Sequence, residues 1–272
     1  MSHFILSAFG DEISPHLAEQ VTVMKDNDVH YLEFRNMEVK CIIDFPLSQI
    51  KEASHFLDDN GMAVSAIGSP IGKYPITEPF PPHLERFKKT LETAQALHTL
   101  YIRMFSFYLP PDEDPAHYRD EVLERWRQFI EAAKNTGLVL LHENERGIYG
   151  ESASRCLDLV ETLHDEMVKI TFDPANFVVC GEESYPQAFR MLQKHIAYLH
   201  IKDAFYKDCS IVPAGQGDGK VPEILFELQQ AGFSGFLSIE PHLQGGLPGG
   251  GPELFAVVAN ALKAILHRLQ PG

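Results

Sequence analysis

The chain has 272 residues, 44% of them hydrophobic and 22% charged, which is typical of a globular protein and not of a disordered one. Its 38 acidic and 23 basic side chains give a net charge of −15, so a nucleic acid is not expected as a partner. No run approaches the roughly 18–20 apolar residues of a membrane span, and the opening MSHFILSAFG lacks the features of a secretory signal, so we expect a cytoplasmic protein without a membrane partner.

Apolar runs rich in Val, Ile, Leu and Phe alternate eight times with amphipathic stretches. The apolar runs predict buried strands, and the amphipathic stretches predict helices with one apolar face. The predicted strands are 3–9, 29–35, 63–69, 100–107, 138–145, 168–174, 197–203 and 235–242. The predicted helices are 14–27, 48–60, 83–98, 114–136, 152–165, 184–194, 222–232 and 252–269.

Eight strand–helix units in this length predict an α/β fold, a (β/α)8 TIM barrel in which a parallel eight-stranded barrel is ringed by helices. No linker rich in Pro, Gly or Ser divides the chain, so we expect one domain over residues 1–272. A doubly wound sheet is the alternative. It would need a Gly-rich phosphate loop after an early strand, and the GDGK at 217–220 lacks that spacing.

Four consecutive predicted strands end in a polar residue that should point into the barrel. These residues are Glu143, Asp173, His200 and Glu240. Buried carboxylates need compensation, and three carboxylates with one imidazole are a donor set that suits a divalent ion such as Mn, Mg, Co or Zn. Each residue alone has a plainer explanation, such as a core histidine or a turn-forming aspartate, but four at one depth favour a metal site.

The cysteines offer no second kind of metal site. Cys41, Cys156, Cys180 and Cys209 show no paired spacing, which indicates neither a thiolate zinc site nor a disulfide framework. We therefore expect ordinary reduced thiols.

Four short motifs, one in each of the last four units, resemble those of the xylose isomerase-like TIM barrel superfamily. Within it they are most similar to the sugar phosphate isomerase/epimerase group. The motifs are HENE (142–145), FDPAN (172–176), LHIKD (199–203) and IEPH (239–242), and the likeness extends over nearly the whole chain. The resemblance implies that Glu143, Asp173, His200 and Glu240 bind one divalent metal ion and that Glu143 and Glu240 are the catalytic acid/base pair.

The chemistry of such a site allows three outcomes. Removing a proton next to a ketone gives an enediolate, which a divalent cation stabilises while one carboxylate takes a proton and another returns one. Return to the opposite face gives an epimerase, and return to the neighbouring carbon gives an isomerase. Loss of a β-hydroxyl gives a dehydratase. We expect a metal-dependent isomerase/epimerase of a sugar or sugar phosphate, with dehydration of an inosose or related keto-polyol as the alternative.

Further polar residues near the strand ends are candidates for binding the substrate, although some of them could simply neutralise the acidic ring or lie in solvent. They are Lys202, His242, Asn176, Arg103, Glu145 and Lys73. The spacing does not decide whether Glu33 and Arg35 face the ligand. The loop 205–219 is either a lid or a surface excursion, and the glycines of 244–251 are a weak signal for anion binding.

Other functions remain open at this point. An endonuclease IV-like DNA repair nuclease is disfavoured, because Asn176 stands where such nucleases carry a histidine for additional metals. Asp203 and Asp208 leave room for a second metal, and a non-catalytic sugar-binding barrel is a third hypothesis. The sequence leaves the oligomeric state open, a homo-oligomer included.

Overall fold

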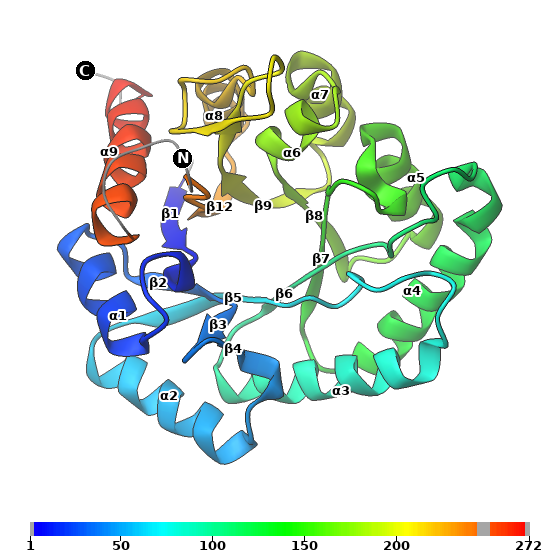
Figure 1. The fold of residues 1–272 in the computed structure, drawn as a ribbon, viewed down its shortest axis with the longest axis horizontal. Helices are drawn as coiled ribbons and strands as arrows, with labels where there is room; N and C mark the ends of the chain where they lie inside the picture. Colours follow the sequence, from blue (N-terminus) through cyan, green and yellow to red (C-terminus); the bar gives the residue numbers. More distant parts are fainter. Residues whose placement is uncertain (1–2, 244–250, 270–272) are drawn as a thin grey trace.

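The computed structural model, which describes residues 3–243 and 251–269, is a closed barrel of eight parallel strands surrounded by helices (Figure 1). The strands follow one another around the barrel in the order β1-β12-β9-β8-β7-β6-β5-β2. They are β1 (His3–Ala8), β2 (Tyr31–Phe34), β5 (Ala63–Gly68), β6 (Tyr101–Met104), β7 (Val139–Glu143), β8 (Val168–Phe172), β9 (Ile196–Ile201) and β12 (Ser234–Ile239). This confirms the predicted (β/α)8 fold.

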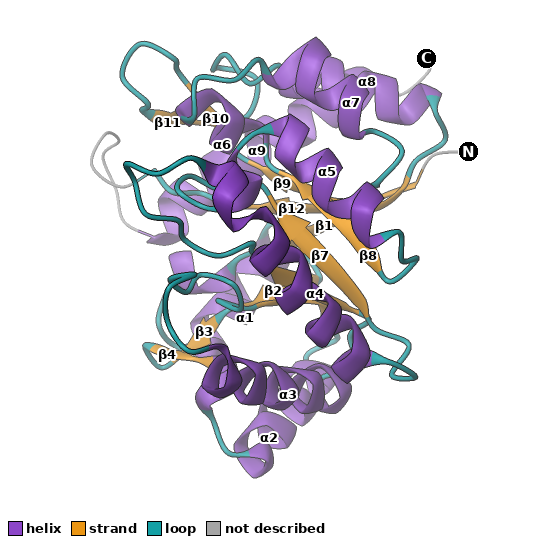
Figure 2. Ribbon diagram, turned by 90° about the vertical axis from the view of Figure 1, so that its right-hand side faces the viewer, coloured by secondary structure: helices purple, strands orange, loops and turns teal. Residues whose placement is uncertain are grey.

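The helices lie outside the strands, as Figure 2 shows from the side. Their apolar faces are buried against the strands. They are α1 (Leu17–Asp26), α2 (Leu47–Asp59), α3 (Phe80–Ala96), α4 (Arg119–Ala133), α5 (Ala153–Leu163), α6 (Pro174–Val179), α7 (Phe189–Leu192), α8 (Val221–Gln230) and α9 (Gly251–Leu269). Within residues 3–243 and 251–269, every helix is too short or too polar to cross a membrane.

The structure differs from the predicted elements where local chemistry interrupts them. The predicted helix 184–194 is a π-helical turn (Ser184–Ala188) followed by the single turn α7, because Pro186 cannot donate a backbone hydrogen bond. The predicted strand 100–107 ends at Met104. Beyond it, the Phe105 and Phe107 amides donate to carbonyls of the loop after β5 and not to the neighbouring strand.

Two short β-hairpins lie at the mouth of the barrel. The pair β3 (Asn36–Met37) and β4 (Lys40–Cys41) follows β2, and the pair β10 (Asp203–Ala204) and β11 (Ile211–Val212) follows β9. Both lie at the carboxyl ends of the barrel strands, the end at which barrel enzymes carry their active sites.

Inside the barrel, side chains stack in layers because alternate residues of every strand point inward. A lower layer includes Leu141 and Tyr198. The Tyr198 hydroxyl hydrogen-bonds to Ser65 Oγ at 2.9 Å, and Ser65 Oγ bonds to Ser7 Oγ at 2.6 Å. His200 lies two residues beyond Tyr198 on the same face, so the charged residues at the strand ends form the next layer toward the mouth.

Candidate active site

The four predicted metal ligands come together at the mouth of the barrel. Glu143 ends β7, Asp173 follows β8, His200 lies in β9 and Glu240 follows β12. One donor atom from each lies within 4.8 Å of the others, and all four side chains are buried. The strand register explains why these four residues meet. Glu143 pairs with Thr171, and Asp173 lies two residues beyond Thr171 on the same face. His200 and Glu240 likewise lie two residues beyond inward-facing positions of their own strands.

His200 lies at the centre of this cluster. Its Nδ1 is 3.0 Å from Glu143 Oε1, 3.6 Å from Glu240 Oε2 and 3.8 Å from Asp173 Oδ2. Burial alone would lower the pKa of His200, but the negative charges around it, that of Glu143 first, raise this pKa well above its ordinary value. Without a metal ion the imidazole is therefore the cation that these carboxylates share.

Two further cations belong to the same layer. The Lys202 ammonium lies 2.9 Å from Asp173 Oδ2 and 2.8 Å from Glu240 Oε2, and Arg103 Nη1 donates to Glu143 Oε2 at 3.0 Å. Burial favours the neutral acid, but His200 and Arg103 lower the pKa of Glu143, and Lys202 and His200 lower that of Glu240 well below its ordinary value. Both glutamates are ionised at neutral pH.

Two asparagines hold the ligand-bearing segments in register. Asn144 pairs with the backbone of Asp173 on both sides, since its Oδ1 accepts from the amide at 3.0 Å and its Nδ2 donates to the carbonyl at 2.9 Å. Asn176 Nδ2 donates to Glu143 Oε1 at 3.2 Å, and the Asn176 amide donates to Asp173 Oδ1 at 2.9 Å. The sequence reasoning missed Asn144, because its partner lies 29 positions away in the chain.

A cavity of about 520 Å³ opens above the cluster, and all six predicted substrate-binding residues line it. They are Lys73, Arg103, Glu145, Asn176, Lys202 and His242. Lys73 Nζ lies 2.7 Å from Glu145 Oε2 and 4.4 Å from the centre of the Phe105 ring.

A second set of charged residues lies at the rim of the cavity, and the sequence did not show which partners they have. Arg35 donates to Asp11 Oδ2 at 2.8 Å and to Glu12 Oε1 at 3.0 Å. His242 Nδ1 lies 2.8 Å from Glu12 Oε1 and 3.2 Å from Glu240 Oε1. Burial would lower the pKa of His242, but its bond to Glu12 and the charge of Glu240 raise it. Arg35 therefore borders the ligand cavity, which the spacing alone could not decide.

The loop 205–219 contributes Cys209 and Ile211 to the wall of the cavity. Asp203 is buried, and its two carboxylate oxygens accept the backbone amides of Ala204, Gly215, Gly217 and Gly219 at 2.8–3.0 Å. Asp208 is exposed and bonds to Ser210. Both aspartates are thus hydrogen-bonded within this segment, and neither belongs to a group of possible metal ligands among the described residues. Of the glycine-rich stretch 244–251, all but Gly251 lies outside the described residues.

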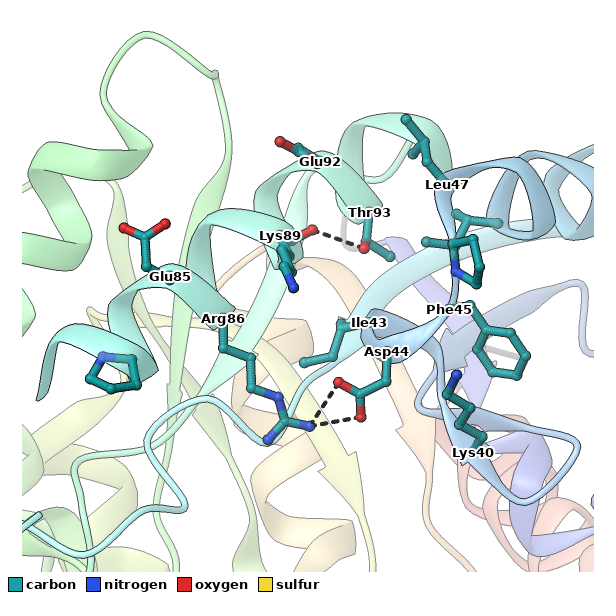
Figure 3. A pocket seen from close by; sticks show the side chains of 13 residues that line it. Lys40, Ile43, Asp44, Phe45, Leu47, Glu85, Arg86, Lys89, Glu92 and Thr93 are labelled. Carbon is teal, nitrogen blue, oxygen red and sulfur yellow. Dashed lines mark hydrogen bonds and ion pairs between the residues drawn. The ribbon is translucent and has the colours of Figure 1, made fainter. Parts of the chain in front are cut away.

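A larger hollow of about 650 Å³ lies on the outer wall, against α2 and α3 (Figure 3). Arg86 Nη2 pairs there with both oxygens of Asp44, at 2.9 and 3.2 Å, and both side chains are exposed by about 40%. Both acidic and basic side chains line this hollow, and neither group of possible metal ligands found among the described residues lies in it. We therefore assign the candidate site to the barrel mouth.

The residues at the mouth fit a divalent ion by donor type and by charge. Three carboxylates and one imidazole are a set that Mn²⁺, Mg²⁺, Co²⁺ or Zn²⁺ accepts. The buried layer holds four carboxylates, those of the three ligand candidates and of Glu33, against the two permanent cations Arg103 and Lys202. Two negative charges remain when His200 is neutral, and one divalent ion balances them.

The sequence profile described as "Xylose isomerase-like TIM barrel" matches residues 22–263. A curated relative, the uncharacterized protein MJ1311 of Methanocaldococcus jannaschii, is 24% identical over 165 residues. That match covers 58% of this chain and 56% of MJ1311, so the chain spans little more than half the length of this relative.

Solved structures share the whole fold. An IOLI protein with a bound zinc atom is 15% identical with a TM-score of 0.79, over 100% of both chains. A D-tagatose 3-epimerase-like protein is 15% identical with a TM-score of 0.76, over 99% of this chain and 100% of that chain. The probable 3-DHS dehydratase AsbF of Bacillus anthracis is 15% identical with a TM-score of 0.76, over 97% and 99%. Identities this low show a common fold and leave the reaction open.

Proposed function

The chain belongs to the xylose isomerase-like TIM barrel family, and on that basis we propose that it is a divalent-metal-dependent isomerase or epimerase of a sugar or sugar phosphate. The observation that carries the proposal is the buried cluster of Glu143, Asp173, His200 and Glu240, whose donor atoms lie within 4.8 Å of one another beneath a polar cavity. These four residues would hold one ion.

In the proposed reaction the two glutamates move the proton. Both are ionised, and each is held by cations on one side, Glu143 by Arg103 and Glu240 by Lys202. One of them would take a proton from the carbon next to the substrate carbonyl, and the other, once it has taken a proton from water, would deliver it to the enediolate. A bound divalent ion would supply the positive charge that stabilises an enediolate.

The residues around the cavity would orient the substrate. Asn176 and Lys202 border both the cavity and the ligand cluster, so they can donate to substrate oxygens close to the reacting carbon. Lys73 and Glu145 lie farther out as an ion pair and can bind hydroxyls or a charged end of the substrate. Positioning of this kind contributes a large part of the rate in enzymes of any class.

A dehydratase acting on an inosose or related keto-polyol is the second candidate. The Lys202 ammonium borders the cavity, and although burial disfavours its charge, Asp173 and Glu240 raise its pKa well above the ordinary value. Such an ammonium can donate a hydrogen bond to a departing β-hydroxyl. The likeness to the probable 3-DHS dehydratase AsbF supports this alternative through the shared fold.

A solvent-deuterium exchange screen tests both candidates. The purified protein with added Mn²⁺ is incubated in deuterated buffer with ketoses, ketose phosphates and inososes, and each product is examined by NMR. Deuterium at one carbon with retained hydroxyls supports the isomerase/epimerase, and loss of water supports the dehydratase. We expect Glu143→Gln and Glu240→Gln each to abolish exchange, while Glu85→Gln, at an exposed position of the outer hollow, leaves it unchanged. No exchange with any substrate at full metal occupancy would contradict the proposal.

A further inference from the structure

Glu33 is a buried carboxylate directly beneath the candidate metal site. It lies in β2, its side chain is completely buried, and its two oxygens are 3.3 and 3.2 Å from His200 Nε2. The other ring nitrogen, Nδ1, faces Glu143, Asp173 and Glu240. His200 therefore stands between Glu33 on one side and the ligand cluster on the other.

Burying this carboxylate costs free energy, and it has few hydrogen-bond or ion-pair partners. Oε1 hydrogen-bonds with His200, whereas Oε2 accepts no hydrogen bond from any residue in 3–243 or 251–269. Arg103 attracts this carboxylate by charge without an ion-pair contact or hydrogen bond to it. A buried carboxylate without full hydrogen bonding destabilises the fold, so its contact with His200 points to a role beyond stability.

Glu33 is also separated from the ligand cavity. It does not belong to the residues that line the cavity, and its exposed fraction is 0%. Packing holds the imidazole between it and the cluster, since the rings of Phe9 and Tyr198 meet the His200 ring edge-on, with centroids 5.2 and 6.0 Å away. Among the described residues, Glu33 therefore makes its direct contact with the cluster through His200.

We propose that Glu33 is a positioning residue that fixes the tautomer of His200, accepting the proton of Nε2 so that the Nδ1 lone pair is directed at the metal ion. The inference rests on the proposed function, because it assigns His200 to the ion. A carboxylate behind a ligating histidine fixes the ring and makes the facing nitrogen a better donor, and losing such a partner typically lowers metal affinity roughly 10- to 100-fold.

Two substitutions separate the charge of Glu33 from its hydrogen bond. Glu33→Gln keeps an oxygen that can accept from Nε2 but removes the charge, and Glu33→Met removes both. Asp203→Asn is the matched control, because Asp203 is equally buried but, within the described part of the chain, bonds only to backbone amides of its loop. It reports what loss of a buried carboxylate does to stability without touching His200.

The test is calorimetric titration of each folded protein with Mn²⁺, with thermal unfolding of the metal-free proteins measured alongside. We expect Glu33→Met to weaken Mn²⁺ binding roughly 10- to 100-fold and Glu33→Gln to weaken it less. Asp203→Asn should bind like wild type even if it unfolds at lower temperature. Wild-type affinity in both Glu33 variants would overturn the inference.

A second readout needs no variant. In the wild-type protein loaded with Zn²⁺, which is diamagnetic, nitrogen-15 chemical shifts of His200 should show a protonated Nε2 and a ligating Nδ1. The opposite tautomer would overturn the inference while leaving the metal site intact. A wild-type protein that binds neither ion would instead overturn the proposed function, and with it this role of Glu33, so the two failures are distinguishable.

Discussion

Lys202 and a metal ion should share the same two carboxylates, which makes Lys202→Met an informative perturbation. Its ammonium lies 2.9 Å from Asp173 and 2.8 Å from Glu240, and its side chain is only 7% exposed. Methionine keeps the apolar stem and removes the charge. In the metal-free protein the two carboxylates then lose their closest permanent cation, whereas in the metal-loaded protein the ion supplies a positive charge in its place.

The expected magnitudes follow from the burial. Removing one partner of a buried ion pair costs about 3–5 kcal/mol, because it leaves a buried charge uncompensated. For a chain of this length 1 kcal/mol corresponds to roughly 2 °C in the unfolding midpoint, so metal-free Lys202→Met should unfold about 6–10 °C below wild type. Since Mn²⁺ no longer competes with the ammonium, saturating Mn²⁺ should raise the midpoint of the variant by more than that of wild type.

Differential scanning calorimetry with and without Mn²⁺ measures all four midpoints. The matched control is Lys207→Met, because the Lys207 side chain is 71% exposed and its nearest carboxylate lies 4.0 Å away. That variant should behave as wild type in both conditions. The reasoning is refuted if metal-free Lys202→Met is as stable as wild type, or if Mn²⁺ stabilises the two proteins equally.

Two further predictions concern the frame of the barrel. Burial lowers the pKa of His142 to about 4, below the roughly 6.5 of a histidine in the unfolded chain. Between these two pH values the unfolded state binds more protons than the folded state, so acidification removes up to about 3 kcal/mol of the free energy of unfolding. In His142→Asn the dependence of unfolding free energy on pH between 6.5 and 4 should therefore be shallower, and an unchanged slope in denaturant titrations would contradict this. Gly72→Ala should unfold the protein or lower its thermal unfolding midpoint far more than Gly61→Ala. Both glycines have positive φ, but a Cβ at Gly72 would lie 2.0 Å from the Phe105 carbonyl oxygen, while a Cβ at Gly61 would meet nothing within 4 Å. Equal midpoints for the two variants would show that the loop after β5 shifts freely.

The barrel and the ligand cluster could be predicted because both depend on periodicity. Eight apolar runs set the strands, and alternation along a strand places Glu143 two residues above Leu141 and His200 two above Tyr198 on the inward face. A polar residue at an inward-facing position of a buried strand is unusual, so it can be recognised in a single sequence. The spatial meeting of four strand ends then follows from the closed parallel sheet.

The supporting residues were not predictable in the same way, since their partners are distant in the chain. Glu33 contacts His200 across 167 positions of sequence, and Asn144 binds the backbone of Asp173 across 29. Asp203 looked like a metal ligand by residue type, yet four backbone amides of a glycine-containing loop satisfy it. Residue type indicates what a side chain can bind, whereas the three-dimensional contacts decide which partner it has.

Anomalous X-ray diffraction from Mn²⁺-soaked crystals would show whether Glu143, Asp173, His200 and Glu240 coordinate one divalent ion. We expect a single strong anomalous peak in each chain, within bonding distance of donor atoms from all four residues. A peak elsewhere, several peaks at the barrel mouth, or no peak there with Lys202 still bridging Asp173 and Glu240, would contradict it.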